Sequence, residues 1–463
     1  MMKEAGIQIT QQDRALTGEL LDFIEASPTA FHAVDTILRE LQAQGCTVLT
    51  EGQAWDLKAG GTYAVTRNGS SVIAFRLGED LAPVTSDDPG HPVHPGERKG
   101  FALPAFHIMA SHSDSPMFRI KEQAELSAVA DHYRKLNTEG YGGMICSTWL
   151  DRPLSIAGRV IVRNGQQLQA RLLKVDRDLV LIPNLAIHFN RKVNDGFAFN
   201  KQIDLLPLLG GADTPGGSLK KLIASELEVE EESILGSDLY LYNRVKGSIW
   251  GAAGEFVSSG RLDDLQCTFA GLKAFLAAAS APGTNVSVLA VFDNEEVGSH
   301  TKQGAASTFL PDILERICIS LGMDREDYRR AIASSLMISA DNAHAVHPNH
   351  PEKSDENNRV YMNEGVVVKS HAGQKYTSDG LSMAWLRALA EQSHVPLQYF
   401  ANRSDEAGGS TLGNIAMSQV SVSAVDVGLA QLAMHSAYET AGVKDTKYLA
   451  DVAAEFYRSQ IRI

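Results

Sequence analysis

The alternation of apolar and polar residues predicts both helices and strands in the first part of the chain. Apolar residues recur with a helical period on both sides of Ser27-Pro28, which predicts a pair of helices over residues 15–45. Residues 62–77 alternate around Asn68-Gly69, a sequence typical of a β-hairpin turn. A short apolar strand is then expected over residues 107–112.

The texture of the sequence changes further along. Residues 85–100 hold three prolines and three glycines, which predicts an exposed loop or insertion. Between residues 118 and 245, glycines and charges interrupt short strand-like runs such as 159–162 and 179–182. Within this region, 210–235 combine a Gly/Pro-rich loop with a charged helix ending in EVEEESIL.

From Gly260 onward, strands and helices alternate, which favours an α/β layer architecture. The expected elements are a helix over 265–275, a strand over 286–292, a helix over 309–321, a strand over 335–340 and a C-terminal helix from about Thr446. No internal repeat interrupts this order.

Length and charge narrow the class of protein. A chain of 463 residues corresponds to roughly two to four domains. Its 42 basic and 56 acidic residues give a net charge of −14, which disfavours binding to nucleic acid or to an anionic membrane surface. Four scattered cysteines without a CxxC pair predict reduced thiols and a cytoplasmic protein. We expect neither a signal peptide nor a membrane span.

Histidine or acidic residues follow several of the apolar strands. His112 and Asp114 come directly after the 107–112 run, where the histidine is able to bind a metal and the carboxylate to orient it; a polar loop start is the alternative. Glu295 and Glu296 follow the buried strand ending at Phe292. Because adjacent carboxylates repel each other, a bound cation explains this pair better than a solvated turn does.

Three further positions are ambiguous when taken singly. Asp263 opens a helix and has the alternative role of an N-cap. Asp341 follows another apolar strand, and His435 lies beside apolar residues, as many structural core histidines do. Together, however, these residues supply the ligands for two metal ions bridged by one carboxylate, with a glutamate left over. Strand ends are also where α/β sheets place their sites.

The motifs that carry these residues resemble those of a known enzyme family. HSDSP, GRLDDL, FDNEEVGS, SADNAHAVHPN and AMHSAYE occur in the order found in the M18 metallopeptidases, the aspartyl aminopeptidase family. SPTAFHAV, WLDRPLSIAGRVIV and IPNLAIHFNR resemble the same family, so the similarity extends over almost the whole chain.

The resemblance implies a role for each site residue. One metal would be held by His112, Asp263 and Asp341, and the other by Asp263, Glu296 and His435. Glu295 would be the general base and Asp114 would orient His112. His188 would reach a neighbouring subunit's active site, and His344, Lys369 and Tyr376 would contact substrate. Asp264 replaces the asparagine that commonly follows the bridging aspartate, which adds charge without changing the ligand count.

A fold and an assembly are implied as well. The catalytic α/β domain, with a mixed sheet flanked by helices, would comprise residues 1–117 and 246–463. An inserted β-rich dimerisation domain would occupy 118–245. Dimers of the family build a tetrahedral dodecamer, so we expect a homo-oligomer that acts on peptides.

The implied activity is removal of N-terminal residues, Asp or Glu above all, with two divalent ions per subunit. Zinc is expected, and manganese or cobalt suits the same N/O ligands. For Lys369, at the end of the run Val366–Val368, the alternative is an ordinary strand-end lysine facing solvent. Two other functions remain open: a di-metal amidohydrolase or deacylase acting on N-acyl amino acids, and a non-catalytic shell protein with a vestigial metal site.

Overall fold

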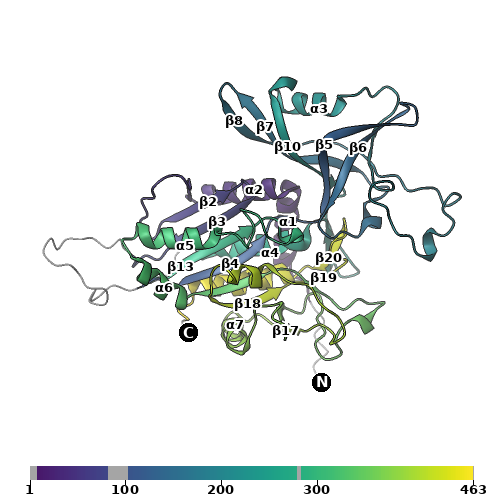
Figure 1. The fold of residues 1–463 in the computed structure, drawn as a ribbon. Coiled ribbons are helices and arrows are strands. Elements are labelled where there is room, and N and C mark those ends of the chain that lie inside the picture. Colours follow the sequence, from purple (N-terminus) through teal and green to yellow (C-terminus); the bar gives the residue numbers. More distant parts are fainter. Residues whose placement is uncertain (1–7, 82–102, 279–282, 462–463) are drawn as a thin grey trace.

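The computed structural model describes residues 8–81, 103–278 and 283–461. Within these residues the chain forms three sheets of nine, six and five strands. The six-stranded sheet stands apart from the rest as a smaller lobe (Figure 1). The loop expected over 85–100 lies outside the described residues.

The central sheet has the strand order β1-β2-β3-β13-β4-β14-β18-β16-β17. Its strands are β1 (Thr47–Leu49), β2 (Thr62–Arg67), β3 (Ser71–Leu77), β4 (Phe106–His112), β13 (Val286–Phe292), β14 (Leu336–Ala340), β16 (Val366–Lys369), β17 (Leu397–Phe400) and β18 (Ser423–Gly428). β13, β4, β14 and β18 are parallel neighbours. The carboxyl ends of these four strands therefore meet at one edge of the sheet.

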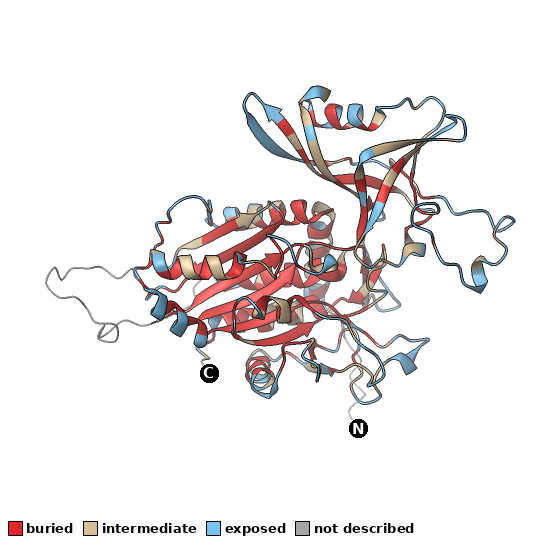
Figure 2. Ribbon diagram, viewed as in Figure 1, coloured by how far each residue is buried: buried red, intermediate tan, exposed pale blue. Residues whose placement is uncertain are grey.

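Helices cover both faces of the central sheet, so its middle strands are buried throughout (Figure 2). One hydrophobic cluster joins the sheet to α1 (Gln11–Ala26), α2 (Ala30–Ala43), α4 (Leu262–Ala277), α7 (Gly380–Gln392) and α9 (Asp445–Arg458). A second joins the opposite face to α5 (Phe309–Ser320), α6 (Arg325–Ala333) and α8 (Leu412–Met417). Burial on both faces explains why these strands read as continuous apolar runs.

The chain leaves the central sheet after β4 and builds the smaller lobe. Its sheet has the order β8-β7-β10-β5-β6-β9 and is antiparallel throughout. The elements are β5 (Met117–Ala128), β6 (Tyr133–Tyr141), β7 (Leu154–Asn164), β8 (Gln167–Lys174), β9 (Leu208–Gly210), β10 (Ile234–Asn243) and α3 (Ser218–Leu227). α3 packs on this sheet in a hydrophobic cluster of its own.

A five-stranded sheet, β11-β12-β20-β19-β15, completes the described structure. Its strands are β11 (Ser248–Trp250), β12 (Phe256–Ser259), β15 (Ala343–His344), β19 (Ala430–Leu432) and β20 (Glu439–Gly442). β12 leads directly into α4. Short 3-10 helices occur at η1 (Cys146–Trp149), η2 (Val193–Asp195), η3 (Glu231–Ser233), η4 (Glu295–Val297) and η5 (Pro351–Lys353).

Most of the expected elements are confirmed, and two are wrong. The charged helix ends at Leu227, because Glu228 adopts a left-handed conformation and the chain resumes as strand at Ile234. No strand forms over 179–182. Val180 and Ile182 bridge to different partners, Leu154 and Leu150, so no continuous ladder develops.

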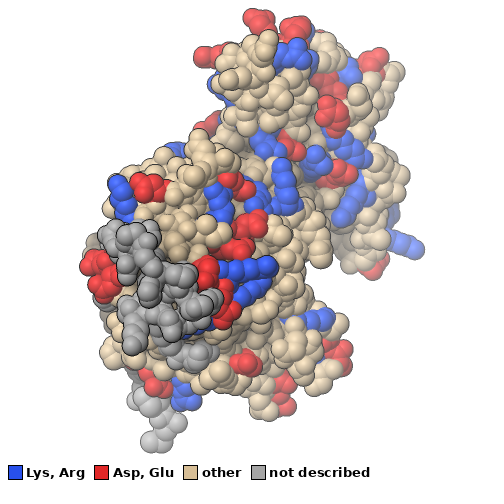
Figure 3. All heavy atoms as spheres, turned by 60° about the vertical axis from the view of Figure 1, so that its left-hand side comes forward, with Lys and Arg blue, Asp and Glu red and all other residues tan. Residues whose placement is uncertain are grey.

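The hairpin is confirmed, with β2 and β3 joined at Asn68-Gly69. Both turn residues have positive φ, 61° and 66°, as the tight hairpin turn requires. Among the described residues, no helix is long and apolar enough to cross a bilayer. On the face shown in Figure 3, acidic and basic side chains lie among one another over both lobes.

Candidate metal centre

Three neighbouring parallel strands deliver acidic and histidine side chains to one edge of the central sheet. β4 ends at His112, β13 is followed by Glu295 and Glu296, and β14 is followed by Asp341. The backbone N–H of Ser113 donates to the Phe292 carbonyl at 2.8 Å, which locks the ends of β4 and β13 together. Strand order alone thus brings four predicted site residues to one place.

Asp263 and His435 reach the same place from outside the central sheet. Asp263 lies in the first turn of α4 with extended rather than helical dihedrals, φ −82° and ψ 106°. His435 lies in the turn between β19 and β20, with φ +66°. The carboxylate of Glu439 accepts hydrogen bonds from both backbone N–H groups, at 3.1 Å from Asp263 and 2.7 Å from His435. Glu439 therefore ties these two segments together.

The converging side chains form two groups that share Asp263. The His112 group comprises His112, Asp263, Asp264 and Asp341, and the His435 group comprises Asp263, Glu296 and His435; in each, ligand atoms lie within 4.8 Å of one another. One oxygen of Asp263 is 3.5 Å from His112 Nε2, and the other is 3.4 Å from His435 Nε2. This is the placement of a bridging carboxylate, so Asp263 does not serve as an N-cap.

Several carboxylate oxygens in the two groups are buried without a hydrogen-bond partner. They are one oxygen each of Asp263, Asp264 and Glu296. A buried carboxylate without a partner is costly, and clustering several of them multiplies the cost unless a cation compensates. The residues present therefore fit two divalent cations with imidazole and carboxylate ligands, a set that suits zinc, manganese or cobalt.

The electrostatics of the site reflect this crowding. Burial, together with the neighbouring charges of Asp263 and Asp114, raises the pKa of Glu296 well above its ordinary value. Burial would also raise the pKa of Asp263, but the close imidazole rings of His112 and His435 outweigh it and hold that pKa below the usual range. The bridging carboxylate is thus the one most readily ionised in the cluster.

The second ring nitrogen of each histidine is held by a hydrogen bond. His112 Nδ1 lies 3.1 Å from the Asp114 carbonyl oxygen and 3.4 Å from its carboxylate. His435 Nδ1 lies 2.7 Å from the carbonyl oxygen of Gly143. Such partners fix the ring orientation and leave Nε2 facing the Asp263 carboxylate, where it would be available to a cation. Asp114 also accepts hydrogen bonds from the backbone N–H groups of Glu295 and Glu296, at 3.1 and 3.2 Å.

Glu295 lies beside the cluster but belongs to neither ligand group. It is half-buried in η4, and its N–H is fixed by Asp114. Burial, reinforced by the carboxylates of Asp341 and Asp114, raises its pKa to about 8. A carboxyl group whose pKa lies near neutral pH is able both to accept and to release a proton there.

The residues named as substrate contacts occupy different environments. Lys369 is only 2% exposed, so the alternative of a solvent-facing lysine is wrong. Its Nζ donates to the Asp341 carbonyl at 2.7 Å and lies 5.4 Å from the centre of the Tyr376 ring. His344 is exposed at the end of β15, and His188 is exposed on a loop of the smaller lobe. Neither histidine belongs to the two groups within this chain.

Two residues of the centre, Glu439 and Tyr141, were not singled out by sequence reasoning, and a third, Asp264, was assigned a smaller part than the structure gives it. Glu439 lies four positions after His435 in AMHSAYE. This short separation from a predicted metal ligand was the only sign in the sequence that Glu439 supports the site. Asp264, expected only to add charge, falls within the His112 group. Tyr141 donates to the Asp114 carboxylate at 2.6 Å. It lies between Gly140 and Gly142 in the smaller lobe, where nothing local marks such a role.

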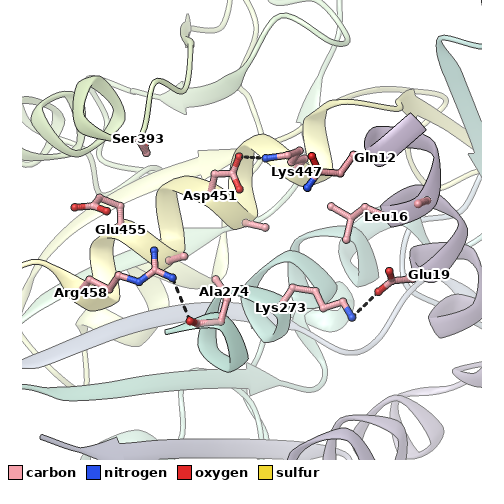
Figure 4. A pocket seen from close by; sticks show the side chains of 14 residues that line it. Gln12, Leu16, Glu19, Lys273, Ala274, Ser393, Lys447, Asp451, Glu455 and Arg458 are labelled. Atoms are coloured by element: carbon pink, nitrogen blue, oxygen red, sulfur yellow. Dashed lines mark hydrogen bonds and ion pairs between the residues drawn. The ribbon is translucent and has the colours of Figure 1, made fainter. Parts of the chain in front are cut away.

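A separate groove of about 480 Å³ lies between α1, α4 and α9 (Figure 4). Four of its charged side chains form two ion pairs, Lys273 with Glu19 at 2.6 Å and Lys447 with Asp451, and Arg458 donates to the Ala277 carbonyl. The residues described as lining it include no member of the two metal groups. The groove therefore adds nothing to the chemistry of the centre.

Comparison with known proteins agrees with this geometry. The family described as Aminopeptidase I zinc metalloprotease (M18) matches residues 23–457. The chain is 48% identical over 444 residues to the probable M18 family aminopeptidase 2 of Clostridium acetobutylicum and 46% identical over 444 residues to that of Clostridium novyi; each match covers 95% of this chain and 98% of the relative.

A solved structure resembles the whole chain as well. A chain of the cryo-EM structure of the Ape4 and Nbr1 complex aligns with a TM-score of 0.90 and 33% identity, covering 97% of this chain and 87% of that one. The resemblance found in the sequence motifs is thereby confirmed. The chain belongs to the M18 aminopeptidase family, a family of metallopeptidase hydrolases.

Proposed function

We propose that this protein is a co-catalytic two-metal aminopeptidase that removes N-terminal residues, acidic ones by preference, from peptides. The observation that carries the proposal is Asp263, whose two oxygens face two different histidines while buried carboxylate oxygens around it lack partners. His112, Asp263 and Asp341 would hold one cation, with Asp264 beside them. Asp263, Glu296 and His435 would hold the other.

Bound divalent ions would supply Lewis acidity, which acidifies water and polarises the peptide carbonyl. Glu295 accepts the proton of the attacking water and delivers it to the leaving amine. Its raised pKa and its position outside both ligand groups support this role. Asp114 keeps the His112 ring in place during turnover. Zinc is the proposed metal, and manganese and cobalt suit the same ligands.

The test of the activity compares a substrate with a free N-terminal Asp with its N-acetyl form. An aminopeptidase cleaves the free form and spares the acetylated one, whereas a deacylase acts on the acetylated amino acid. Glu295→Gln should lower kcat by roughly 10²–10⁴-fold while the metal content stays unchanged. Glu326→Gln, an exposed acidic residue on α6, is the control. Normal turnover in Glu295→Gln would overturn the assignment of the base.

Lys369 is proposed as the cation that favours acidic N-terminal residues. Its buried ammonium lies behind Asp341 and against Tyr376, in a cluster otherwise dominated by carboxylates. A hollow of about 490 Å³, lined by residues that include His344, Phe400 and Met434, opens beside His435 and offers room for substrate. A fixed positive charge here would offset the repulsion that an acidic side chain meets.

Specificity is tested with Lys369→Met on matched substrates that begin with Asp, Glu or Ala. Cleavage of the acidic substrates should fall more than cleavage of the Ala substrate. The matched control is Lys375→Met, since Lys375 bonds backbone carbonyls at Ala407 and Gly408 outside the cluster. Equal losses on all three substrates would contradict the specificity role.

The smaller lobe, residues 118–245, is proposed as a dimerisation domain within a homo-oligomer, in the family's case a dodecamer. Apolar side chains stand exposed along its loop: Leu185, Ile187, Phe189, Phe197 and Ile203 are 40–80% exposed. Surfaces of this kind mark protein–protein contacts. His188 lies among these side chains. A second copy of the chain that covers the loop would have His188 of the first copy near its own metal centre. There the imidazole would stabilise the developing oxyanion.

Subunit mixing tests that arrangement. Glu295→Gln and His188→Ala subunits are each expected to be impaired. A mixed oligomer contains sites with Glu295 from one subunit and His188 from the other, so activity should recover on mixing. No recovery, with exchange verified by mass, would refute action across subunits. All four cysteines are free thiols, which suits a reducing compartment, the cytoplasm.

A further inference from the structure

A loop of the smaller lobe lies against the metal centre of the larger one. We call residues 141–145, between the end of β6 and η1, the junction segment. At Gly142, where φ is +76°, an added Cβ would lie 3.1 Å from Glu296 Cβ and 3.4 Å from Pro116 Cα. The backbone of the smaller lobe therefore runs in van der Waals contact with a ligand of the His435 group.

Tyr141 forms a hydrogen bond with Asp114, the residue that orients His112. Its hydroxyl donates to the Asp114 carboxylate at 2.6 Å, and the same oxygen accepts a hydrogen bond from Asn294 Nδ2 at 2.8 Å. Asp114 is the residue that holds His112 Nδ1. A short chain of hydrogen bonds thus leads from β6 through Asp114 to His112.

The other end of the junction segment bonds the His435 group. The carbonyl oxygen of Gly143 accepts from His435 Nδ1 at 2.7 Å. The N–H of Ile145 donates to the His435 carbonyl at 3.0 Å. Both the ring and the backbone of His435 are therefore fixed by the same five residues that fix Asp114.

We propose that the junction segment sets the geometry of both metal groups, so that the smaller lobe is part of the catalytic centre's support. Tyr141 is a positioning residue that acts through Asp114, and Gly143 positions His435 through its backbone carbonyl. The inference rests on the proposed two-metal function. Hydrogen-bond partners of this kind typically change metal affinity or activity by roughly 10–100-fold when they are removed.

The first test is Tyr141→Phe, which removes only the hydroxyl. Zn²⁺ titrations of metal-stripped protein, without peptide present, should show one site weakened by roughly 10–100-fold and the other nearly unchanged. Excess Zn²⁺ should restore most of kcat, whereas a residue that contacted substrate would leave a defect in KM. The control is Tyr240→Phe, because the Tyr240 ring packs edge-on against Tyr141 at 5.7 Å.

A second pair of variants tests the junction segment and distinguishes a loss of metal affinity from a loss of folding stability. Gly142→Ala introduces a methyl group against Glu296. Gly165→Ala, in the turn between β7 and β8, has a similar positive φ of 60° but nothing within 4 Å of an added Cβ. Both substitutions place alanine in a left-handed conformation and should lower the free energy of unfolding by similar amounts. A loss of Zn²⁺ affinity in the His435 group should therefore appear only in Gly142→Ala, where the methyl group meets Glu296.

A double-mutant cycle separates positioning from general stabilisation. If Tyr141 acts through Asp114, the Zn²⁺ affinity of Tyr141→Phe/Asp114→Asn should equal that of Asp114→Asn alone. Wild-type Zn²⁺ affinities in Tyr141→Phe and Gly142→Ala, or additive losses in the cycle, would overturn the inference. Because these affinities are measured without substrate, a wild-type protein that fails to trim peptides would refute the proposed function and leave this result standing.

Discussion

The two metal groups share Asp263, yet they are held by different kinds of structure. His112 is 1% exposed at the end of β4, between two parallel neighbours, and its partner Asp114 lies two residues along the same segment. The His435 side chain is 31% exposed in a turn with positive φ, and its partner carbonyl belongs to the other lobe. One group is fixed by strands and the other by loops, so we expect them to differ in affinity and in response to mutation.

The largest effect should come from the residue common to both groups. Asp263→Asn removes the one carboxylate charge that both groups share and should release both cations, with a fall in kcat/KM larger than the roughly 10²–10⁴-fold expected for Glu295→Gln. Metal content after desalting, measured by mass spectrometry, checks it. Asp445→Asn is the control, since Asp445 is a buried carboxylate that accepts the N–H of Asn363 outside the centre. If the variant retained both metals, Asp263 would not be the bridging ligand.

The next effect separates the two groups. A chelator titration of the wild-type protein should release the metals in two steps, the loop-held His435 group first, because its histidine is less buried and less rigidly held. His435→Ala should abolish the first step and His112→Ala the second. His350→Ala is the matched control, because that histidine is exposed and paired with Glu352. A single concerted release that both variants abolish would show that the groups do not differ.

The same contrast explains what the sequence predicted. His112, Glu296 and Asp341 each follow an apolar run, and the parallel order of β4, β13 and β14 brings such strand ends together. Local pattern was therefore enough to place the strand-held part of the site. For Asp263 and His435 the sequence alone left structural alternatives open, and the family resemblance supplied their roles.

For other parts of the centre, no local sequence pattern indicates a role. The carbonyl of Gly143 is a backbone acceptor, which no side-chain motif records. Tyr141 and Glu439 act over long separations in sequence, on Asp114 and on Asp263. The strand at Lys369 was correctly expected, but its burial depended on packing from distant segments. Pattern thus predicts elements and their ends, while the supports of a site depend on tertiary contacts.

Glu439→Gln should give an intermediate effect. The carboxylate accepts from the backbone of Asp263 and of His435, and an amide offers one acceptor oxygen in place of two. The Glu439 carboxylate holds the backbone of His435 directly, whereas His112 is held by the ladder of β4, so metal affinity in the His435 group should fall by roughly 10–100-fold and in the His112 group by less. Isothermal titration with Zn²⁺ measures both.

The control for this variant is Glu255→Gln. Glu255 also accepts a backbone N–H, from Ala253, but on an exposed turn. Equal losses of affinity in the two groups would mean that Glu439 acts through Asp263 alone. The loop-held turn would then be no more sensitive than the strand ends.

The smallest effect is expected from removing one threonine hydroxyl near His435 or near His112. Thr148 Oγ1 accepts the N–H of Ala437 at 2.9 Å and so helps to hold the turn of His435. Thr268 Oγ1 donates to the carbonyl of His112 at 2.9 Å. Each bond is worth about 1 kcal/mol, or about fivefold in an equilibrium constant. Thr148→Val should lower Zn²⁺ affinity by about that factor, because the turn of His435 is held by single hydrogen bonds and not by a strand ladder.

Thr268→Val should instead lower the free energy of unfolding by about 1 kcal/mol and leave Zn²⁺ affinity nearly unchanged, because the ladder of β4 keeps His112 in place. Denaturant unfolding of metal-stripped protein and Zn²⁺ titration of each variant separate the two outcomes. If both variants lost affinity alike, the strand-held histidine would be as adjustable as the loop-held one. The rigidity of the site would then have to come from the metals themselves rather than from the sheet.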